Sequence, residues 1–205
     1  LIALIMPAIK SAMATANTTK CVSHHRSVAA GLLMYAGDND GRLPPYGSFT
    51  SPVSVDQSRY WWNLVRPYVG MPDNPALGLG VNYMRCPAAA STVSTTIGVH
   101  YAELSGNAPF GFEGLNFPGS MKLAKLSPQT VLTADIKNPA GQMWFLSPNE
   151  YPLNTDSDGD GIKDSYPGNR FAARHKGAAA GSFADGSARL VRLAGWGRKE
   201  NHLWG

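Results

Sequence analysis

The sequence predicts an α+β fold, in which one long N-terminal helix packs on an antiparallel β-sheet within a loop-rich head. Apolar residues recur at helical spacing near the start, and short β-branched or aromatic runs separated by turn signals follow from residue 97 onward. The 22 glycines and 15 prolines favour many turns and loops over a helical bundle, because both residue types interrupt helices. The 205 residues divide into an N-terminal helix, residues 1–37, and one globular head, residues 38–205.

The helical segment opens with a run of apolar residues, Leu1 to Ile9, before the first charge at Lys10. This run is shorter than the ~20 apolar residues that cross a bilayer, and soluble proteins rarely expose such a run. We therefore expect it to end a longer apolar helix, a membrane or filament stalk whose front part precedes this sequence. The alternative, a core segment at the start of a complete protein, stays open.

From residue 11 onward the helical pattern becomes amphipathic. Apolar side chains at offsets of 0, 7, 11 and 14 fall on one face of a helix. These residues are Cys21, Val28, Leu32 and Tyr35. Gly37 is the predicted C-cap, and the next four residues, Asp38-Asn39-Asp40-Gly41, are a predicted turn. The second half of the helix is thus expected to lie against the head by one face.

The head is predicted to contain a loop, a short helix and several strands. Residues 44–57 are the predicted loop, and residues 58–68 are a predicted amphipathic helix with Ser58 as its N-cap. Asp185-Gly186 predicts a two-residue hairpin turn near the end of the chain. Strands are expected at residues 97–104, 130–137, 142–146, 180–184 and 187–193.

Two cysteines suggest a covalent tie between the helix and the head. Cys21 lies on the predicted inward face, and Cys86 lies in a loop that needs restraint. We predict a disulfide between them, which persists only in oxidising compartments. Two unrelated reduced core cysteines are the alternative, and neither cysteine has a metal-binding spacing such as C-x-x-C. A catalytic thiol at Cys21 is disfavoured, because the pattern implies no cleft.

An acidic segment, residues 156–164, predicts a calcium site. Carboxylates at positions 1, 3, 5 and 9, a glycine at position 6 and a backbone carbonyl at position 7 match the oxygen ligands that calcium takes. Pro167 stands where an EF-hand has its bidentate glutamate, so the segment resembles a short extracellular calcium loop instead. A solvated Asp/Gly turn is the alternative. The predicted ligands are Asp156, Asp158, Asp160, Ile162 and Asp164.

The distribution of charge argues against a nucleic-acid partner. The formal net charge of +4 arises from +3 in residues 1–37, −4 in residues 38–169 and +5 in residues 170–205. A DNA reader needs a concentrated basic face, and the C-terminal tail alone hints at one. DNA uptake through that tail is a minor alternative, and its basic residues are Arg189, Arg192, Arg198 and Lys199.

These motifs together resemble those of one known family. An apolar start leads through Cys21 into Met34-Tyr35-Ala36-Gly37-Asp38-Asn39-Asp40-Gly41, and a later Cys86-Pro87 follows. Nine residues separate His175 from Asp185-Gly186. This combination is similar to the prepilin-type pseudopilins that carry a His-x9-Asp-Gly signature. The resemblance implies a pilin-like fold and a structural role for His175, Asp185 and Gly186.

The same resemblance implies a non-enzymatic filament subunit of a type II secretion-like pseudopilus or a type IV pilus-like filament. Its partners are then other pilin subunits, contacted through the N-terminal helix, and the inner membrane before assembly. The head is then expected in the periplasm, or, as the alternative, in an extracellular filament. Calcium binding before the final hairpin also agrees with the family, whose major pseudopilins bind calcium in a C-terminal loop.

Two other functions stay open. A surface adhesin that binds polysaccharide needs an exposed aromatic pocket, for which Trp61, Trp62, Trp144 and Trp196 are candidates. A secreted hydrolase needs a catalytic set such as His175, Ser182 and Asp185. The hydrolase is disfavoured because the sequence has no Gly-x-Ser-x-Gly elbow, and because Asp185 is expected to hold the turn.

Overall fold

The computed structural model describes residues 2–51, 54–70, 84–89, 96–100, 109–110, 113–114, 117–136, 144–145 and 172–192. The helices in these ranges are α1 (Ile2–Asp38), α2 (Trp61–Val65) and the 3₁₀ turns η1 (Gln57–Arg59), η2 (Arg66–Val69) and η5 (Leu123–Lys125). The strands are β1 (Ser48–Ser51), β2 (Ser54–Asp56), β3 (Ile97–His100), β4 (Glu113–Gly114), β5 (Phe117–Pro118), β6 (Val131–Asp135), β7 (Trp144–Phe145), β8 (Ala178–Phe183) and β9 (Ala188–Arg192).

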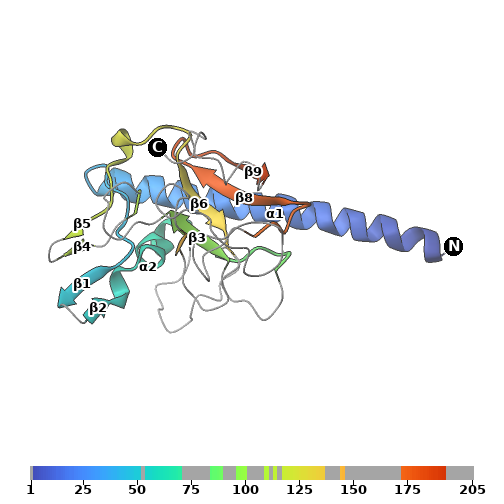
Figure 1. The fold of residues 1–205 in the computed structure, drawn as a ribbon, viewed down its shortest axis with the longest axis horizontal. Coiled ribbons are helices and arrows are strands. Elements are labelled where there is room, and N and C mark those ends of the chain that lie inside the picture. The colour runs from blue at the N-terminus through green and yellow to red at the C-terminus, as the bar shows by residue number, and fades with distance from the viewer. Residues whose placement is uncertain are drawn as a thin grey trace, which may run out of the picture.

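The main sheet has the strand order β7-β3-β6-β8-β9, and α1 packs against its strands β6, β8 and β9 (Figure 1). Neighbouring strands from β3 to β9 pair in antiparallel fashion, which confirms the predicted α+β class. The edge is different, because β7 pairs with β3 in parallel and not with β6 across the predicted turn. Turn signals describe local chain reversal, whereas this pairing depends on a strand far away in sequence.

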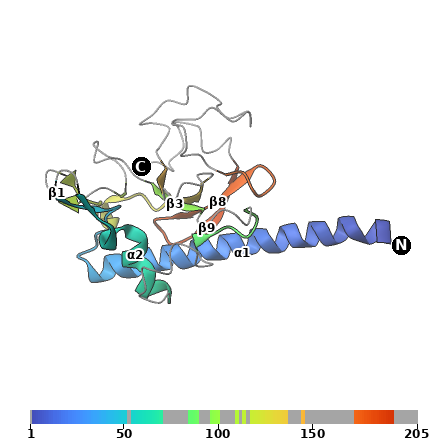
Figure 2. The same cartoon turned by 90° about the horizontal axis from the view of Figure 1, so that it is seen from below.

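Helix α1 is a continuous rod whose two halves have different surroundings (Figures 1 and 2). Residues 5–16 are exposed and project beyond the sheet, whereas Cys21, Val28 and Leu32 are fully buried, as the predicted face requires. Tyr35 is half-buried. No helix in the described part of the chain has the length and apolar character of a membrane span.

The end of α1 lies beyond the predicted cap. The helix passes through Gly37 to Asp38, and the left-handed residues are Asp40 (φ 53°) and Gly41 (φ 74°). The Gly41 N–H donates to the Ala36 carbonyl at 2.8 Å. The predicted turn over residues 38–41 is therefore confirmed. Gly37 is an ordinary helical residue and not the C-cap, because the left-handed backbone that ends the helix occurs at residues 40 and 41.

Two predictions for the region after α1 are wrong. The expected loop contains β1 and β2, which belong to a second sheet of order β2-β1-β4-β5. The expected helix of residues 58–68 is broken into η1, α2 and η2, with Tyr60 rather than Ser58 as the N-cap of α2. The helix is interrupted near Pro67 because proline has no N–H to continue the hydrogen bonds of α2. The strands were not predicted because β1 pairs with β4, which is far away in the sequence.

The terminal hairpin is present, with a longer turn than the expected two residues. Gly186 N–H donates to the Phe183 carbonyl at 2.9 Å, and Phe183 N–H donates to the Ser187 carbonyl at 3.0 Å. Gly186 has φ 80° and Asp185 Oδ1 accepts from Ser187 N–H at 2.8 Å, so the loop is a tight turn that ends in a glycine bulge. Asp185 and Gly186 thus shape this turn.

Candidate functional site

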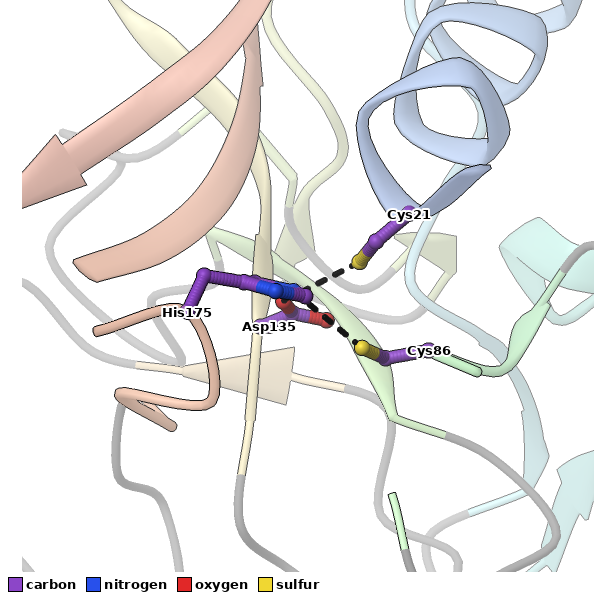
Figure 3. Close-up of side chains that lie close together, drawn as sticks. All are labelled: Cys21, Cys86, Asp135 and His175. Atoms are coloured by element: carbon purple, nitrogen blue, oxygen red, sulfur yellow. Dashed lines mark hydrogen bonds and ion pairs between the residues drawn. The ribbon is translucent and has the colours of Figure 1, made fainter. Parts of the chain in front are cut away.

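Four side chains meet beneath α1, and each comes from a different segment of the chain (Figure 3). Cys21 lies on α1, and Cys86 lies in the segment of residues 84–89. Asp135 is the last residue of β6, and His175 lies in the turn before β8. All four are buried, and one ligand atom from each lies within 4.8 Å of all the others. We call these residues the Cys-Cys-Asp-His cluster.

The polar atoms of the cluster point at one another. Cys21 Sγ donates to Asp135 Oδ2 at 3.2 Å, and Cys86 Sγ lies 3.2 Å from His175 Nε2. His175 Nε2 also lies 3.5 Å from Asp135 Oδ2. Each sulfur therefore has a non-sulfur partner, and the four ligand atoms surround one small volume.

A second layer of polar groups holds the Asp135 carboxylate. Ala180 N–H donates to Oδ2 at 3.3 Å, while His25 Nε2 and Arg174 Nη1 lie 3.5 Å and 3.7 Å from Oδ1. The other nitrogen of His25 contacts Thr133 Oγ1 at 2.8 Å. The fully buried carboxylate is thus neutralised from both sides, as a buried charge requires.

The orientation of His175 is fixed by Thr18. The Thr18 hydroxyl donates to the Ala14 carbonyl at 2.8 Å, and Thr18 Oγ1 lies 3.1 Å from His175 Nδ1. Since the single hydroxyl hydrogen is used on Ala14, Oγ1 accepts a hydrogen from Nδ1. Nδ1 therefore carries a proton, and Nε2 faces the two sulfurs and the carboxylate.

The environment shifts the pKa of every member of the cluster. The hydrogen bonds with Asp135 and Cys86 raise the pKa of His175 to about 9. The contact with the neighbouring Cys21 thiol lowers the pKa of Cys86, against the opposing effect of burial, and His175 lowers it further. The same contact and burial raise the pKa of Cys21. Burial opposes ionisation of Asp135, but His175, His25 and Arg174 hold the pKa of its carboxyl well below its usual range.

The predicted disulfide is not formed in this structure. Cys21 and Cys86 lie together, as the prediction required, but both are free thiols. Their sulfurs are directed at Asp135 and His175 instead. No short motif marks this cluster in the sequence, because each of its four residues is separated from the next by 40 to 65 residues.

Asp135 is the site residue that the sequence analysis missed. An acid at the end of the otherwise apolar run Val131-Leu132-Thr133-Ala134 was the available signal, since a lone carboxylate in such a strand needs buried partners. His175 contacts this acid, and its backbone N–H and carbonyl pair with Ala178, so it does fix the entry to β8.

Other predicted site residues have different outcomes. The five calcium ligands, together with Trp196, Arg198 and Lys199, lie outside the described residues. Trp61 is fully buried in the core, and Trp62 is half-buried with its ring stacked on Tyr60. The Ser182 hydroxyl pairs with Thr133 Oγ1 at 2.6 Å, while the contacts of His175 are with Thr18, Cys86 and Asp135.

A groove of about 710 Å³ lies between the projecting half of α1 and the head. Thr18 and His175 line it, so one edge of the Cys-Cys-Asp-His cluster faces this groove. Lys10, Arg174, Lys176 and Arg192 also line it, which makes it basic. The groove therefore leads from solvent to the histidine of the cluster.

No protein-family model matches the chain, and neither the curated proteins nor the solved structures contain a match to it. The function must therefore be argued from the fold and the site.

Proposed function

We propose that the chain is a non-enzymatic structural subunit of a pilus-like filament, of the pseudopilin type, which assembles through α1. One observation carries the proposal: residues 5–16 of a continuous helix are exposed and present large apolar side chains to solvent. Exposed apolar surface of this kind is typical of a surface that another molecule covers.

The exposed apolar residues have a helical arrangement. Ile5, Ile9 and Met13 follow one another at a spacing of four and form a single ridge, with Met6 beside it. Each of these side chains is about half exposed or more. Ridges of residues four apart pack into the grooves of another helix, so the partner that suits this surface is the same segment of a second copy.

The second half of α1 supports this role because the head holds it rigidly. The helix contacts β6, β8 and β9 of the main sheet and also α2 and η2. Gly31 allows the close approach of Val65 and Val69, since a Cβ at position 31 would lie 2.8 Å and 2.7 Å from their methyl carbons. A firmly held helix lets contacts between projecting segments fix the spacing of the heads.

Under this proposal the partners are other pilin-like subunits, the helix lies in the inner membrane before assembly, and the head faces the periplasm. The motif combination around Cys21, Cys86, His175 and Asp185-Gly186 supports the same family. Calcium binding by residues 156–164 is part of the proposal and rests on the sequence pattern alone.

A photo-crosslinking amino acid at position 9 of the full chain tests the proposal. The expected product is a dimer whose linked peptide, identified by mass spectrometry, lies in residues 2–16 of the second copy. Met13→Asp should abolish this product, because a charge cannot be buried between apolar helices without a partner.

Met34→Asp is the matched control, because Met34 lies on the same helix and is similarly exposed (54%, against 60% for Met13) but is near the head-packed end. It should leave the crosslinked dimer unchanged. A chain that stays monomeric at every concentration, or an equal loss in both variants, would contradict assembly through the projecting segment.

A further inference from the structure

We propose that the Cys-Cys-Asp-His cluster is a structural zinc site that fastens α1 to the head. The ligand atoms are Cys21 Sγ, Cys86 Sγ, Asp135 Oδ2 and His175 Nε2. Thiolate, imidazole and carboxylate are the donors that Zn²⁺ takes in proteins, and four protein ligands make a closed tetrahedral site of the structural kind. This inference does not depend on the proposed filament role.

The spacing of the donor atoms fits a tetrahedral ion. With Zn–S near ~2.3 Å and Zn–N or Zn–O near ~2.0 Å, neighbouring ligand atoms lie about 3.3–3.8 Å apart. The cluster has 3.2 Å between Cys21 Sγ and Asp135 Oδ2, 3.2 Å between Cys86 Sγ and His175 Nε2, and 3.5 Å between Nε2 and Oδ2. All four ligand atoms lie within 4.8 Å of one another, so side chains that already converge would hold an ion after drawing closer together.

The second layer matches what a zinc ligand needs. A metal-bound histidine gives its other N–H to a hydrogen-bond acceptor, which fixes the ring. Thr18 does this for His175 by accepting from Nδ1, so Nε2 is the nitrogen that faces the cluster and can bind a metal once its proton has left. Asp135 presents Oδ2 to the cluster, while its other oxygen faces His25 and Arg174.

The charges also balance. Two thiolates and one carboxylate carry −3, Zn²⁺ carries +2, and the Arg174 guanidinium beside Asp135 carries +1, which gives zero in a buried site. On binding, every ligand atom that carries a proton, including His175 Nε2, releases it to solvent, and the two sulfurs, Nε2 and Oδ2 ligate the metal. A disulfide would use only the two sulfurs and would leave the convergence of Asp135 and His175 unexplained.

Cobalt(II) is the probe for this site, added to the purified full chain kept reduced with a phosphine. One equivalent should produce thiolate-to-cobalt charge-transfer absorption and the intense visible bands of a tetrahedral ion, and Zn²⁺ should displace it. Residues 156–164 contain no sulfur, so calcium-type binding there cannot produce this absorption. Absence of the charge-transfer band would overturn the proposal.

Native mass spectrometry of the chain isolated without reductant gives an independent test. The expected mass is that of the chain plus one zinc ion. A chain without metal, whether it has two free thiols or is lighter by the two hydrogens lost on forming a disulfide, would overturn the proposal.

Variants of two threonines on α1 separate metal binding from folding. Thr18→Val removes the acceptor for His175 Nδ1 and should weaken cobalt affinity about 10–100-fold. Thr19→Val is the matched control, because Thr19 makes the same kind of bond to the carbonyl four residues earlier but is exposed. Thr19→Val should keep the affinity of the unmodified chain. Equal affinity in both variants would count against the assigned role of Thr18.

Cys86→Ser removes a direct ligand and should abolish the charge-transfer band at equimolar cobalt. Circular dichroism of each variant checks that the helix content is kept. A Cys86→Ser chain that retains its fold and also retains the full band would overturn the assignment of Cys86.

Discussion

Asp135 is the residue on which the buried polar centre depends, because its carboxylate is the shared partner of two histidines, a thiol and an arginine. Loss of the carboxylate would leave these groups without a buried partner, and an unpaired buried charge costs several kcal/mol of folding free energy. The sequence marked His175 and both cysteines as notable but not Asp135, because what connects the four is their meeting in space.

Asp135→Asn should lower the free energy of unfolding by about 3–5 kcal/mol, because it removes the negative charge that the surrounding donors require. Urea denaturation with a chelator present measures this on the metal-free chain. Glu113→Gln is the control, because the Arg59–Glu113 pair is 48% exposed on both sides and should contribute at most about 1 kcal/mol. Comparable losses in both variants would refute the central role of Asp135.

Among the elements, α1 is the one whose packing the sequence described best. The predicted face of Cys21, Val28 and Leu32 is the buried face, because period-3.6 spacing of apolar residues reports burial directly. The sequence did not reveal that α2 and η2 also pack against this helix, which they approach closely at Gly31.

Gly31→Ala should lower the free energy of unfolding by about 1–3 kcal/mol, because the new methyl group would overlap Val65 and Val69. Gly37→Ala is the matched control in the same helix, where a Cβ meets nothing within 4 Å. It should instead raise stability by about 0.5–1 kcal/mol through the better helix propensity of alanine. Thermal unfolding of both variants measures these changes. A Gly31→Ala chain that is more stable than the unmodified chain would show that α2 and η2 do not pack tightly against position 31.

The main sheet shows where local patterns stop being informative. The hairpin of β8 and β9 was predictable because Asp185-Gly186 acts within a few residues. The parallel pairing of β7 with β3, and the second sheet built from β1 and β4, were not, since each needs a partner far away in the chain. Short polar strands such as Ser48–Ser51 have no alternation strong enough to be noticed.

At the scale of the whole molecule, α1 links two regions with different tasks. Its exposed first half presents the apolar ridge, and its second half carries Cys21 into the buried cluster and packs on the sheet (Figures 2 and 3). If the zinc site forms, it fixes the helix to three other segments of the head. The projecting half of α1 would then keep a fixed position relative to the head, so contacts between projecting halves would also position the heads.

Calcium should raise the melting temperature of the full chain if residues 156–164 bind it. Short extracellular sites have dissociation constants of about 10⁻⁴–10⁻³ M, so roughly 10 mM calcium should add about 1.4–2.7 kcal/mol. Asp158→Ala and Asp160→Ala should each abolish this gain, whereas Glu113→Gln, which removes an exposed acid elsewhere, should keep it. An identical melt in calcium and in chelator would exclude the site.

The sequence by itself determined the α+β class, the long helix with its buried face, and the terminal hairpin. These features are encoded by residues that are near neighbours along the chain, through helical period, turn chemistry and chain reversal. Tertiary structure alone decided the strand partners and the buried cluster. The site consists of Cys21, Cys86, Asp135 and His175, which meet only because α1 packs on the sheet and brings four distant segments together. A local sequence pattern cannot predict a contact between residues so far apart in the chain.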